Sequence, residues 1–396
     1  MTATTREQRT DARRAQLLAA AARLFRRHGF HGVGMDDIGA AAGVSGPAVY
    51  RHFPGKQALL AAITDGYLDL LGQRLAAARE AGHARPLLEA AVSAALADPD
   101  GLVVCTRQPR WLDPAGQRRL RERRAALARG ASAGEGALWT ADTATARPAD
   151  LLRSRAAAGA LISLALSRAA PAQVRERVAG DMARAVLGAW LPPSAEFPAP
   201  APADARPGLP HASRREAVLA AATRLFRERG FRGVSLRDIG AETGITASAV
   251  NRHFDSKEQL LDAAFHRGAE QIAGGIAVAL ARSPDTRTAV REILDRYARL
   301  AVDCRDLIVI STTELHSLPD GQQRDRRQHQ RVYVDELRHV LGRAYPELPD
   351  EETGLRAAAV FALVNEVVMD DELIRRPALA DELAALAVAA AVPPSA

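Results

Sequence analysis

The two lysines of the chain are the residues whose placement says most about its chemistry. Lys56 and Lys257 stand against 51 arginines, and they occupy the same position in two copies of an internal repeat, 201 residues apart. The first copy reads GVSGPAVYRHFPGKQALL from Gly43, and the second reads GITASAVNRHFDSKEQLL from Gly244. Each copy therefore offers an ammonium, a guanidinium and an imidazole as hydrogen-bond donors within a few residues. This pattern predicts one module, used twice, whose partner is an anion.

The positive charge of the chain is concentrated in the repeated segments. Between Leu18 and Ala62 the two copies are identical at 26 of 45 positions. Residues 1–62 carry nine basic and four acidic residues, a net charge of +5, and residues 211–262 carry nine and seven, a net charge of +2. The whole chain is only +6, so the remainder is slightly negative. Such a distribution is expected where the repeated segments meet a polyanion such as nucleic acid.

The elements that must position these donors are helices. Alanine and leucine dominate, aromatic residues are few, and no long run alternates with period 2, so the sequence predicts an all-α fold. In each copy a first helix ends at a glycine, Gly29 or Gly230. Two short helices, about 36–42 and 46–52 in the first copy, then flank a glycine turn, and a long helix follows from about residue 55. Two short helices joined by such a turn form a helix-turn-helix motif.

A proline-rich segment divides the chain. Residues 192–210 contain seven prolines in 19 positions, which favours an extended linker that spans at most roughly 55–60 Å. Because weaker similarity continues beyond each repeated segment, we expect a tandem duplication of a whole unit. The predicted parts are a first helix-turn-helix domain at 10–62, a first helical domain at 63–191, the linker at 192–210, a second helix-turn-helix domain at 211–262 and a second helical domain at 263–392.

The repeated segment resembles the DNA-binding domain of the tetracycline-repressor (TetR) family. The resemblance is carried by LFRRHGFHGV, MDDIGAAAGVS and YRHFPGKQALL in the first copy and by LFRERGFRGV, LRDIGAETGIT and NRHFDSKEQLL in the second. It is close over the repeated segment of each half and extends beyond it only as a general helical pattern. It implies a sequence-specific, ligand-responsive transcriptional regulator, more often a repressor, that binds double-stranded operator DNA.

The resemblance also implies roles for individual residues. Phosphate contacts, which fix the register on the duplex without reading it, are expected from Tyr50, His52, Lys56, Asn251, His253 and Lys257. Base reading is expected at the start of the second short helix and on its outward positions, which are Ser45, Gly46, Pro47, Arg51, Thr246, Ala247, Ser248 and Arg252. Four arginines that we expect to precede the first helices are candidates for backbone or minor-groove contacts, namely Arg13, Arg14, Arg214 and Arg215. Ser45 and Thr246 are also the expected N-caps.

One position departs from the repeat, and it leaves two alternatives open. Asn251 stands where the first copy has Tyr50, so its side chain either keeps a polar contact, reads a base or does neither, and the second head is either functional with a different preference or degenerate. A chain with two functional heads can bind DNA as an intramolecular pseudodimer, at an effective concentration near the millimolar range. The rival arrangement is a homodimer of chains. Because the two sets of reading residues differ, the pseudodimer predicts an operator that is not a perfect palindrome.

The helical domains are expected to bind an effector and to supply a dimerisation surface. Polar residues within apolar helices are candidates for lining a pocket for a small molecule of unknown identity, because burial demands partners for them. The candidates are Thr106, Gln108, Trp111, Tyr297, Thr312, Thr313, Glu314, His316, Asn365 and Glu366. The last two helices of each half, expected at about 149–167 with 174–191 and 352–374 with 378–392, are the candidate dimerisation surface.

Other classes of protein find little support in the sequence. No metalloprotease, phosphate-loop or serine-hydrolase motif is present, so we expect no enzyme, no metal site and no cofactor. Cys105 and Cys304 appear at roughly equivalent positions of the two halves and leave a redox-sensing regulator as an alternative function. Without a signal-peptide pattern or a spanning apolar stretch, we expect no membrane partner and a cytoplasmic protein that is nucleoid-associated when bound to DNA.

Overall fold

The chain folds into two compact units, residues 1–187 and 188–396. The structure is a computed structural model that describes residues 2–129, 148–192 and 211–393, without the side chains of residues 2–7 and 148. Every regular element in these ranges is a helix, which confirms the predicted all-α class. The division between the units falls a few residues before the expected linker, whose residues 193–210 lie outside the described ranges, as do residues 130–147.

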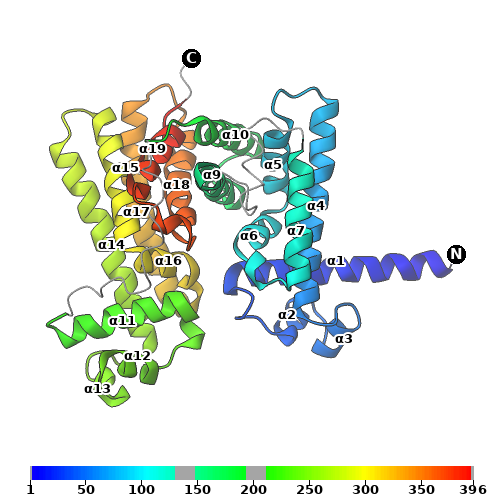
Figure 1. Cartoon of the computed structure of the whole chain (residues 1–396), viewed down its shortest axis with the longest axis horizontal. Coiled ribbons are helices and arrows are strands. Elements are labelled where there is room, and N and C mark those ends of the chain that lie inside the picture. The colour runs from blue at the N-terminus through cyan, green and yellow to red at the C-terminus, as the bar shows by residue number, and fades with distance from the viewer. Residues whose placement is uncertain (1, 130–147, 193–210, 394–396) are drawn as a thin grey trace. The chain divides into compact units, whose positions relative to one another are not determined.

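The first unit begins with a long helix that is followed by two short ones (Figure 1). A second long helix, α4, then packs on α5, α6 and α7, and α5 also packs on α9. The elements are α1 (Thr2–His28), α2 (Met35–Ala41), α3 (Gly46–Tyr50), α4 (Lys56–Glu80), α5 (Pro86–Ala97), α6 (Pro99–Arg107), the 3-10 helix η1 (Pro109–Trp111), α7 (Pro114–Ala128), α9 (Pro148–Leu166) and α10 (Ala172–Gly188).

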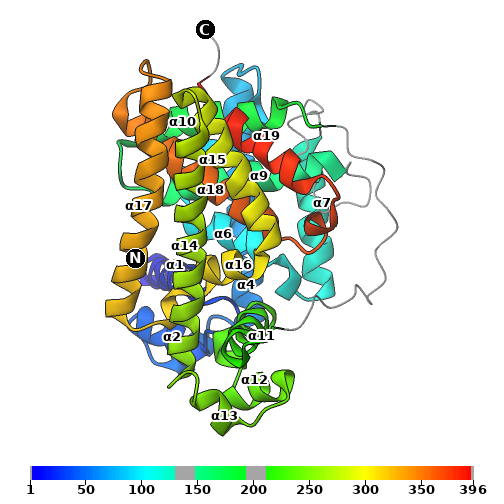
Figure 2. The same ribbon diagram turned by 90° about the vertical axis from the view of Figure 1, so that its left-hand side faces the viewer.

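The second unit repeats this order. Its first three helices gather at one end (Figure 1), and α14 and α17 lie side by side above them (Figure 2). The elements are α11 (Arg214–Arg229), η2 (Phe231–Gly233), α12 (Leu236–Thr243), α13 (Ala247–Asn251), α14 (Lys257–Arg282), α15 (Thr286–Asp303), α16 (Arg305–Thr313), η3 (Leu315–Ser317), α17 (Asp320–Ala344), α18 (Asp350–Val368), η4 (Leu373–Arg375) and α19 (Leu379–Ala391).

Each head, defined here as α1–α3 with the start of α4, or α11–α13 with the start of α14, is built onto the helices that follow it. The boundaries expected after residues 62 and 262 both fall inside a continuous helix, α4 or α14. In the second unit Ile310 of α16 and Leu318 are part of the same buried cluster as Phe226, Ile239 and Phe254 of the head. A movement of α16 therefore acts directly on the packing of the head.

Two glycines in each head set the geometry of the helix-turn-helix. Gly43 and Gly244 adopt φ angles of 67° and 68°, a left-handed conformation that glycine reaches without steric cost. Gly39 and Gly240 lie where the turn crosses the preceding helix, so closely that a Cβ atom would meet the carbonyl oxygen of Val44 at 2.9 Å or that of Ile245 at 2.6 Å. Steric constraints in the turn thus explain why glycine stands at these positions in both copies.

Two sequence-based expectations about helix ends are wrong. Arg13 and Arg14 do not precede the first helix, because α1 already begins at Thr2; that stretch has neither proline nor glycine to stop it. The helix expected at 352–374 ends at Val368, because the Asp370 carboxylate accepts hydrogen bonds from the next backbone N–H groups and closes a turn. Arg214 and Arg215 do not precede their helix either, because Arg214 is the first residue of α11.

Candidate nucleic-acid interface

The second short helix of each head presents three exposed residues at spacing i, i+3, i+4. In α3 and the residue after it these are Pro47, Tyr50 and Arg51, and Tyr50 is 55% exposed. In α13 they are Ser248, Asn251 and Arg252. The opposite side of each helix is fixed by a fully buried valine, Val49 or Val250. We call these two exposed sets the recognition faces.

The side chains on the recognition faces are available for a partner. Among the described residues, Arg51 and Arg252 make no hydrogen bond or ion pair, although arginines elsewhere in both units pair extensively with carboxylates. Exposed guanidinium groups without a counter-ion carry donors for base edges or phosphates. The rings of His52 and His253 are likewise without a polar partner in the part of the chain that is described.

The residues at the start of the recognition helices do not all fit the predicted reading role. Gly46 is buried, and a Cβ atom there would overlap the carboxylate of Asp36, so it presents nothing to a base. Ala247, its counterpart, is half-buried. Ser45 and Thr246 are the N-cap residues, as expected, but only the Thr246 hydroxyl accepts a hydrogen bond, from the Ala249 N–H at 3.2 Å.

Both lysines bind the head itself, a role that the sequence analysis missed. Lys56 Nζ donates to the carbonyl oxygen of Phe30 at 3.0 Å, and Lys257 Nζ donates to those of Phe231 and Val234, each at 2.8 Å. Each ammonium also lies over the phenylalanine ring, 4.8 Å and 4.2 Å from its centre. Partial burial lowers the pKa of both lysines. The predicted phosphate contact of each lysine must therefore compete with, or add to, these bonds.

Replacing Lys257 by methionine is expected to lower the free energy of unfolding by roughly 1–3 kcal/mol, because two partly buried carbonyls lose a charged donor. Lys56→Met is expected to cost less, since one carbonyl loses its donor there. Urea titrations followed by circular dichroism on the full chain compare the two variants. Equal stability of Lys257→Met and the wild type would contradict a structural role for this lysine.

Two of the four predicted backbone-contacting arginines also hold the head together. Arg14 donates to the carbonyl of His52 at 3.3 Å, and Arg215 donates to that of His253 at 2.8 Å. Their guanidinium groups lie 4.2 Å and 4.0 Å from the ring centres of Phe53 and Phe254. The first helix is thus tied to the end of the recognition helix in both heads.

The remaining two arginines differ between the heads. Arg13 donates to the side chain of Gln16, and Arg214 is close to the carbonyl of Thr243 at 3.5 Å. Both are exposed, so their side chains remain accessible to a duplex.

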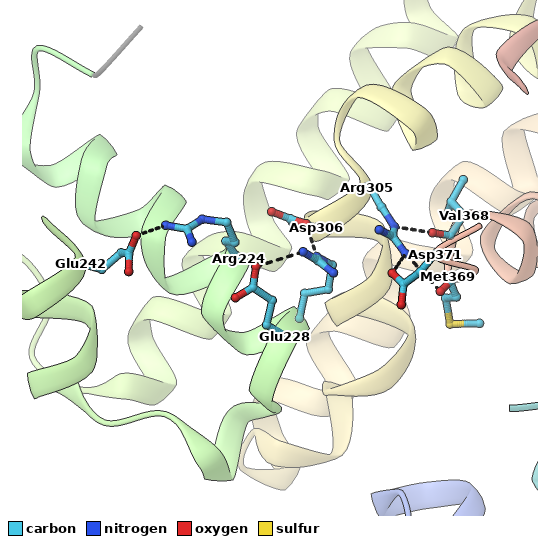
Figure 3. Close-up of polar contacts among 9 residues, drawn as sticks. Arg224, Glu228, Glu242, Arg305, Asp306, Val368, Met369 and Asp371 are labelled. Carbon is cyan, nitrogen blue, oxygen red and sulfur yellow. Dashed lines mark hydrogen bonds and ion pairs between the residues drawn. The ribbon is translucent and has the colours of Figure 1, made fainter. Parts of the chain in front are cut away.

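Each head is connected to its helical domain by an ion pair at the start of the sixth helix of its unit, α6 or α16. Arg26 of α1 pairs with Asp100 of α6, and Arg227 of α11 pairs with Asp306 of α16. In the second unit the neighbouring Arg305 continues the connection, since it donates to the carbonyls of Val368 and Met369 and pairs with Asp371 (Figure 3).

In the second unit these contacts link α18 to the head through α16. Figure 3 shows polar contacts from the end of α18 to the first turn of α16 and from there to α11, and a separate ion pair between Arg224 of α11 and Glu242 of α12. The first unit has Pro99 in the place of Arg305, so its α6 lacks this side chain. The chain of contacts is therefore a feature of the second unit.

The other end of the sixth helix is joined to the head by Gln108 or Glu314. Gln108 Nε2 donates to the carbonyl of Phe25 at 2.6 Å, while the Glu314 carboxylate accepts from the Phe231 N–H and from the Ser317 hydroxyl. Burial raises the pKa of Glu314, and these two hydrogen bonds oppose the rise. An ionisable carboxyl group thus occupies in the second unit the place of a neutral amide in the first.

Replacing Glu314 by glutamine, which copies Gln108, is expected to flatten the pH dependence of stability. Because the folded state raises the carboxyl pKa, it binds more protons than the unfolded state between the ordinary and the raised pKa. The contribution of Glu314 to stability therefore grows as the pH falls through this window and is lost as the pH rises. Urea titrations of both proteins at several pH values measure the difference, and identical pH profiles would contradict it.

The ten candidate pocket residues are not brought together. Tyr297 and Asn365 do meet, with the Tyr297 hydroxyl donating to Asn365 Oδ1 at 2.5 Å, and burial raises the pKa of Tyr297. Tyr297 also packs edge-on against Phe361, which contacts Tyr333 in the same way. Tyr333 was missed because it lies in an otherwise strongly polar helix.

The other candidates serve different contacts. Trp111 packs on His31 with ring centres 4.2 Å apart, so it lies at the first head, which Gln108 also contacts. The hydroxyls of Thr312 and Thr313 donate to carbonyls of their own helix, as polar side chains in helices often do. The backbone carbonyls of Thr106 and His316 accept from Arg155 and Gln323, and Glu366 is buried.

A surface groove of about 790 Å³ lies in the first unit between α1, α4 and the start of α7. It is lined by small residues of α4, among them Ala58, Ala61 and Gly66, with Asp65 at its edge. None of the candidate pocket residues lines it. In the second unit Arg267 stands where the first unit has Gly66, and it pairs with both carboxylate oxygens of Glu216.

The two cysteines are not equivalent, contrary to expectation. Cys105 is buried within α6, whereas Cys304 is the N-cap residue of α16, a position that Asp98 occupies in the first unit. Burial raises the pKa of the Cys304 thiol, which lowers the fraction of reactive thiolate. A cysteine-based switch therefore gains no support from the chemistry of this thiol.

Within the described ranges no group of three or more histidine, cysteine or carboxylate residues is arranged to hold a metal ion. No helix in those ranges is both long and apolar enough to cross a membrane.

Comparison with known proteins finds that both heads match the same family. The family model described as "Bacterial regulatory proteins, tetR family" matches residues 17–63 and 218–264. The HTH-type transcriptional activator FasR of Mycolicibacterium smegmatis is 42% identical over 85 residues, which are 21% of this chain and 39% of FasR. The HTH-type transcriptional repressor KstR2 of Rhodococcus jostii is 33% identical over 95 residues, 24% of this chain and 46% of KstR2. The chain thus spans less than half the length of these two relatives.

A solved structure gives a looser match. A TetR-family transcriptional regulator from Bordetella parapertussis is 20% identical, with a TM-score of 0.42, and the match covers 45% of this chain and 93% of that one.

Proposed function

Because the chain belongs to the tetR family of bacterial regulatory proteins and contains two tandem units of it, we propose that it is a transcriptional regulator that binds operator DNA with both heads. The observation that carries the proposal is the pair of recognition faces. In each, an arginine without a partner follows a short helix whose inner side is locked into the head by a buried valine. Such a helix enters the major groove, where arginine recognises guanine through O6 and N7.

The remaining contacts are proposed to position the heads on the duplex. Tyr50 on the first recognition face, and His52 and His253 beside the two faces, carry hydroxyl or ring N–H donors suited to phosphate oxygens. Lys56 and Lys257 contribute positive charge from the start of the following helix, although their ammonium groups also bind head carbonyls. Arg13 and Arg214 remain exposed and are the better backbone candidates, since Arg14 and Arg215 are committed to the head.

We propose further that one chain acts as a pseudodimer on a non-palindromic operator. The support is that both heads keep the glycine turn, the buried valine and the unpaired arginine, while the outward residues differ. The alternatives are a dimer of chains with four functional heads and a dimer of chains in which one head of each chain is degenerate. Stoichiometric titration of DNA at concentrations far above Kd separates them, because the pseudodimer saturates one operator with one chain and a dimer requires two.

The helical domains are proposed to couple an effector to the heads, with repression as the proposed sign of regulation. An effector acts only through its different affinity for the DNA-bound and the free conformation. The sixth helix is a suitable transmission element, because both of its ends contact the head through Arg26 and Gln108, or through Arg227 and Glu314. The Tyr297–Asn365 pair is the candidate polar group for effector binding in the second unit.

Selection of bound duplexes from a random pool, followed by anisotropy titrations at several salt concentrations, tests the proposal. We expect one enriched sequence and an affinity that falls steeply with salt, as charge neutralisation of phosphates requires. Equal weak binding to all duplexes, or no binding at low salt, would overturn it. Transcription from a promoter that overlaps the selected site then decides the sign of regulation.

A further inference from the structure

Tyr50 of the first recognition face and Asn251 of the second occupy equivalent positions but carry different chemical groups. Tyr50 and Asn251 each follow a buried valine directly, Val49 or Val250, and each precedes an arginine without a partner. Both side chains are exposed. The surrounding backbone is closely similar, since His52 N–H and His253 N–H donate to the preceding valine carbonyls at 3.0 Å and 2.9 Å. At this position the two heads therefore differ in what the side chain can contact and not in the local backbone geometry.

An asparagine cannot replace a tyrosine as a distant phosphate ligand. The tyrosine hydroxyl lies across a whole ring from its backbone, whereas the asparagine amide begins one carbon beyond its Cβ. At equal depth in the groove, the Asn251 amide lies far short of a phosphate that the Tyr50 hydroxyl reaches. What the amide offers is one donor and one acceptor side by side, which match N7 and the N6 amino group of adenine in the major groove.

The neighbouring residues favour a close approach of α13 to the bases. Ser248, three residues earlier on the same recognition face, is small and polar, where the first head has Pro47. The start of α13 is also fixed by the hydrogen bond between the Thr246 hydroxyl and the Ala249 N–H, which Ser45 does not form in the first head. A pre-ordered helix with short side chains brings its backbone nearer to the groove floor than one that carries a tyrosine.

We propose that Asn251 is a base-reading residue that makes the second head specific for an adenine, next to the guanine expected for Arg252. The first head, which carries Tyr50 at this place, reads no base there and instead contacts a phosphate. The operator would then contain one position that is constrained to A·T in the second half-site and unconstrained in the first. This inference rests on the proposed function, because it requires that both heads bind DNA.

The test uses the full chain, the operator selected by the wild type, and a set of duplexes with each base pair replaced in turn. Asn251→Ala is expected to lose roughly tenfold in affinity for the selected operator, within the range that one bidentate base contact provides. On the duplex in which the recognised A·T pair is replaced, the variant and the wild type are expected to bind equally. The salt dependence of binding is expected to remain unchanged, since no phosphate contact is lost.

Tyr50→Ala is the matched variant in the first head. It is expected to weaken binding to all duplexes by a similar factor and to reduce the salt dependence, as removal of a phosphate contact that orders the interface does. A uniform loss for Asn251→Ala, or unchanged affinity for every duplex, would overturn adenine reading while leaving the proposed function intact. Failure of the wild type to select any sequence would instead overturn the proposed function. Thermal unfolding of both variants confirms that these exposed substitutions leave the fold in place.

Discussion

Alanine at both Arg51 and Arg252 is expected to reduce the affinity of the chain for its selected operator by roughly a hundredfold or more. Each arginine is exposed and without a partner among the described residues, so its removal costs the fold little. One bidentate contact to guanine contributes about 1–3 kcal/mol of discrimination, and contacts in separate half-sites are expected to add. Anisotropy titrations at one fixed salt concentration measure the loss.

The control for this prediction removes the same charge elsewhere. Arg118 and Arg121 are exposed on α7 and, like the two reading arginines, have no partner among the described residues. Alanine at both is expected to change operator affinity by no more than roughly twofold, as surface substitutions away from an interface do. A loss equal to that of the Arg51 and Arg252 variant would mean that net charge, rather than recognition, accounts for binding.

The single variants decide between the two descriptions of the second head. If both heads read bases, Arg51→Ala and Arg252→Ala are expected to lose comparable amounts. If the second head is degenerate, Arg252→Ala is expected to bind as the wild type does, and the whole loss of the double variant is then due to Arg51. Either result is informative about the operator, because the base pairs that become unconstrained identify the half-site of each head.

The fold and the recognition faces could be predicted from the sequence because they depend on local signals. Helical spacing of apolar residues, the glycine at each turn and the repeat itself placed α2, α3, α12 and α13 within one or two residues. The start of α1 was misplaced because the residues before Arg13 carry no signal that stops a helix, even though they are polar. Local signals thus predict the short helices at a glycine turn better than they predict where a long helix begins or ends.

The roles of the lysines could not be predicted, because they depend on contacts distant in sequence. The family resemblance implies a phosphate contact for Lys56 and Lys257, with which their charge agrees, whereas the structure brings each ammonium to a carbonyl 26 residues earlier in the chain. A donor that is conserved between two copies of a repeat is equally compatible with a ligand and with a backbone carbonyl. Only the fold shows which acceptor lies within reach.

The same limit applies to the helical domains. Gln108 and Glu314 were chosen as pocket residues because they are polar within apolar surroundings, and burial does demand partners for them. Their partners are backbone groups of the head, at Phe25 and Phe231. Their polarity was therefore a correct sign of a buried contact, but the contact connects the sixth helix to the head. If the proposed coupling of an effector to the heads operates, the two residues would lie on its path and not at the effector site.

Gly240→Ala is expected to lower the free energy of unfolding by roughly 1–3 kcal/mol, the usual cost of overpacking a rigid site. The added Cβ would lie 2.6 Å from the carbonyl oxygen of Ile245 and 3.2 Å from the carbonyl carbon of Thr246, both in the backbone. The turn cannot open freely, because the Ile245 N–H donates to the Gly240 carbonyl at 2.9 Å. Relief of the clash must displace α13, so operator affinity is expected to fall together with stability. Urea titrations and anisotropy on the same preparation measure both effects.

Two further glycine variants make this prediction specific to the turn. Gly39→Ala in the first head is expected to cost somewhat less, since its closest backbone atom would be 2.9 Å away. Gly274→Ala in α14, where nothing lies within 4 Å, is expected to stabilise the chain by roughly 0.5–1 kcal/mol, because alanine loses less conformational freedom than glycine in a helix. Opposite signs for the turn and the helix variants would establish that these turn glycines are required for the close approach of α12 and α13. A stabilising Gly240→Ala would show instead that the turn tolerates a side chain, and the steric account of the recognition helix would then be wrong.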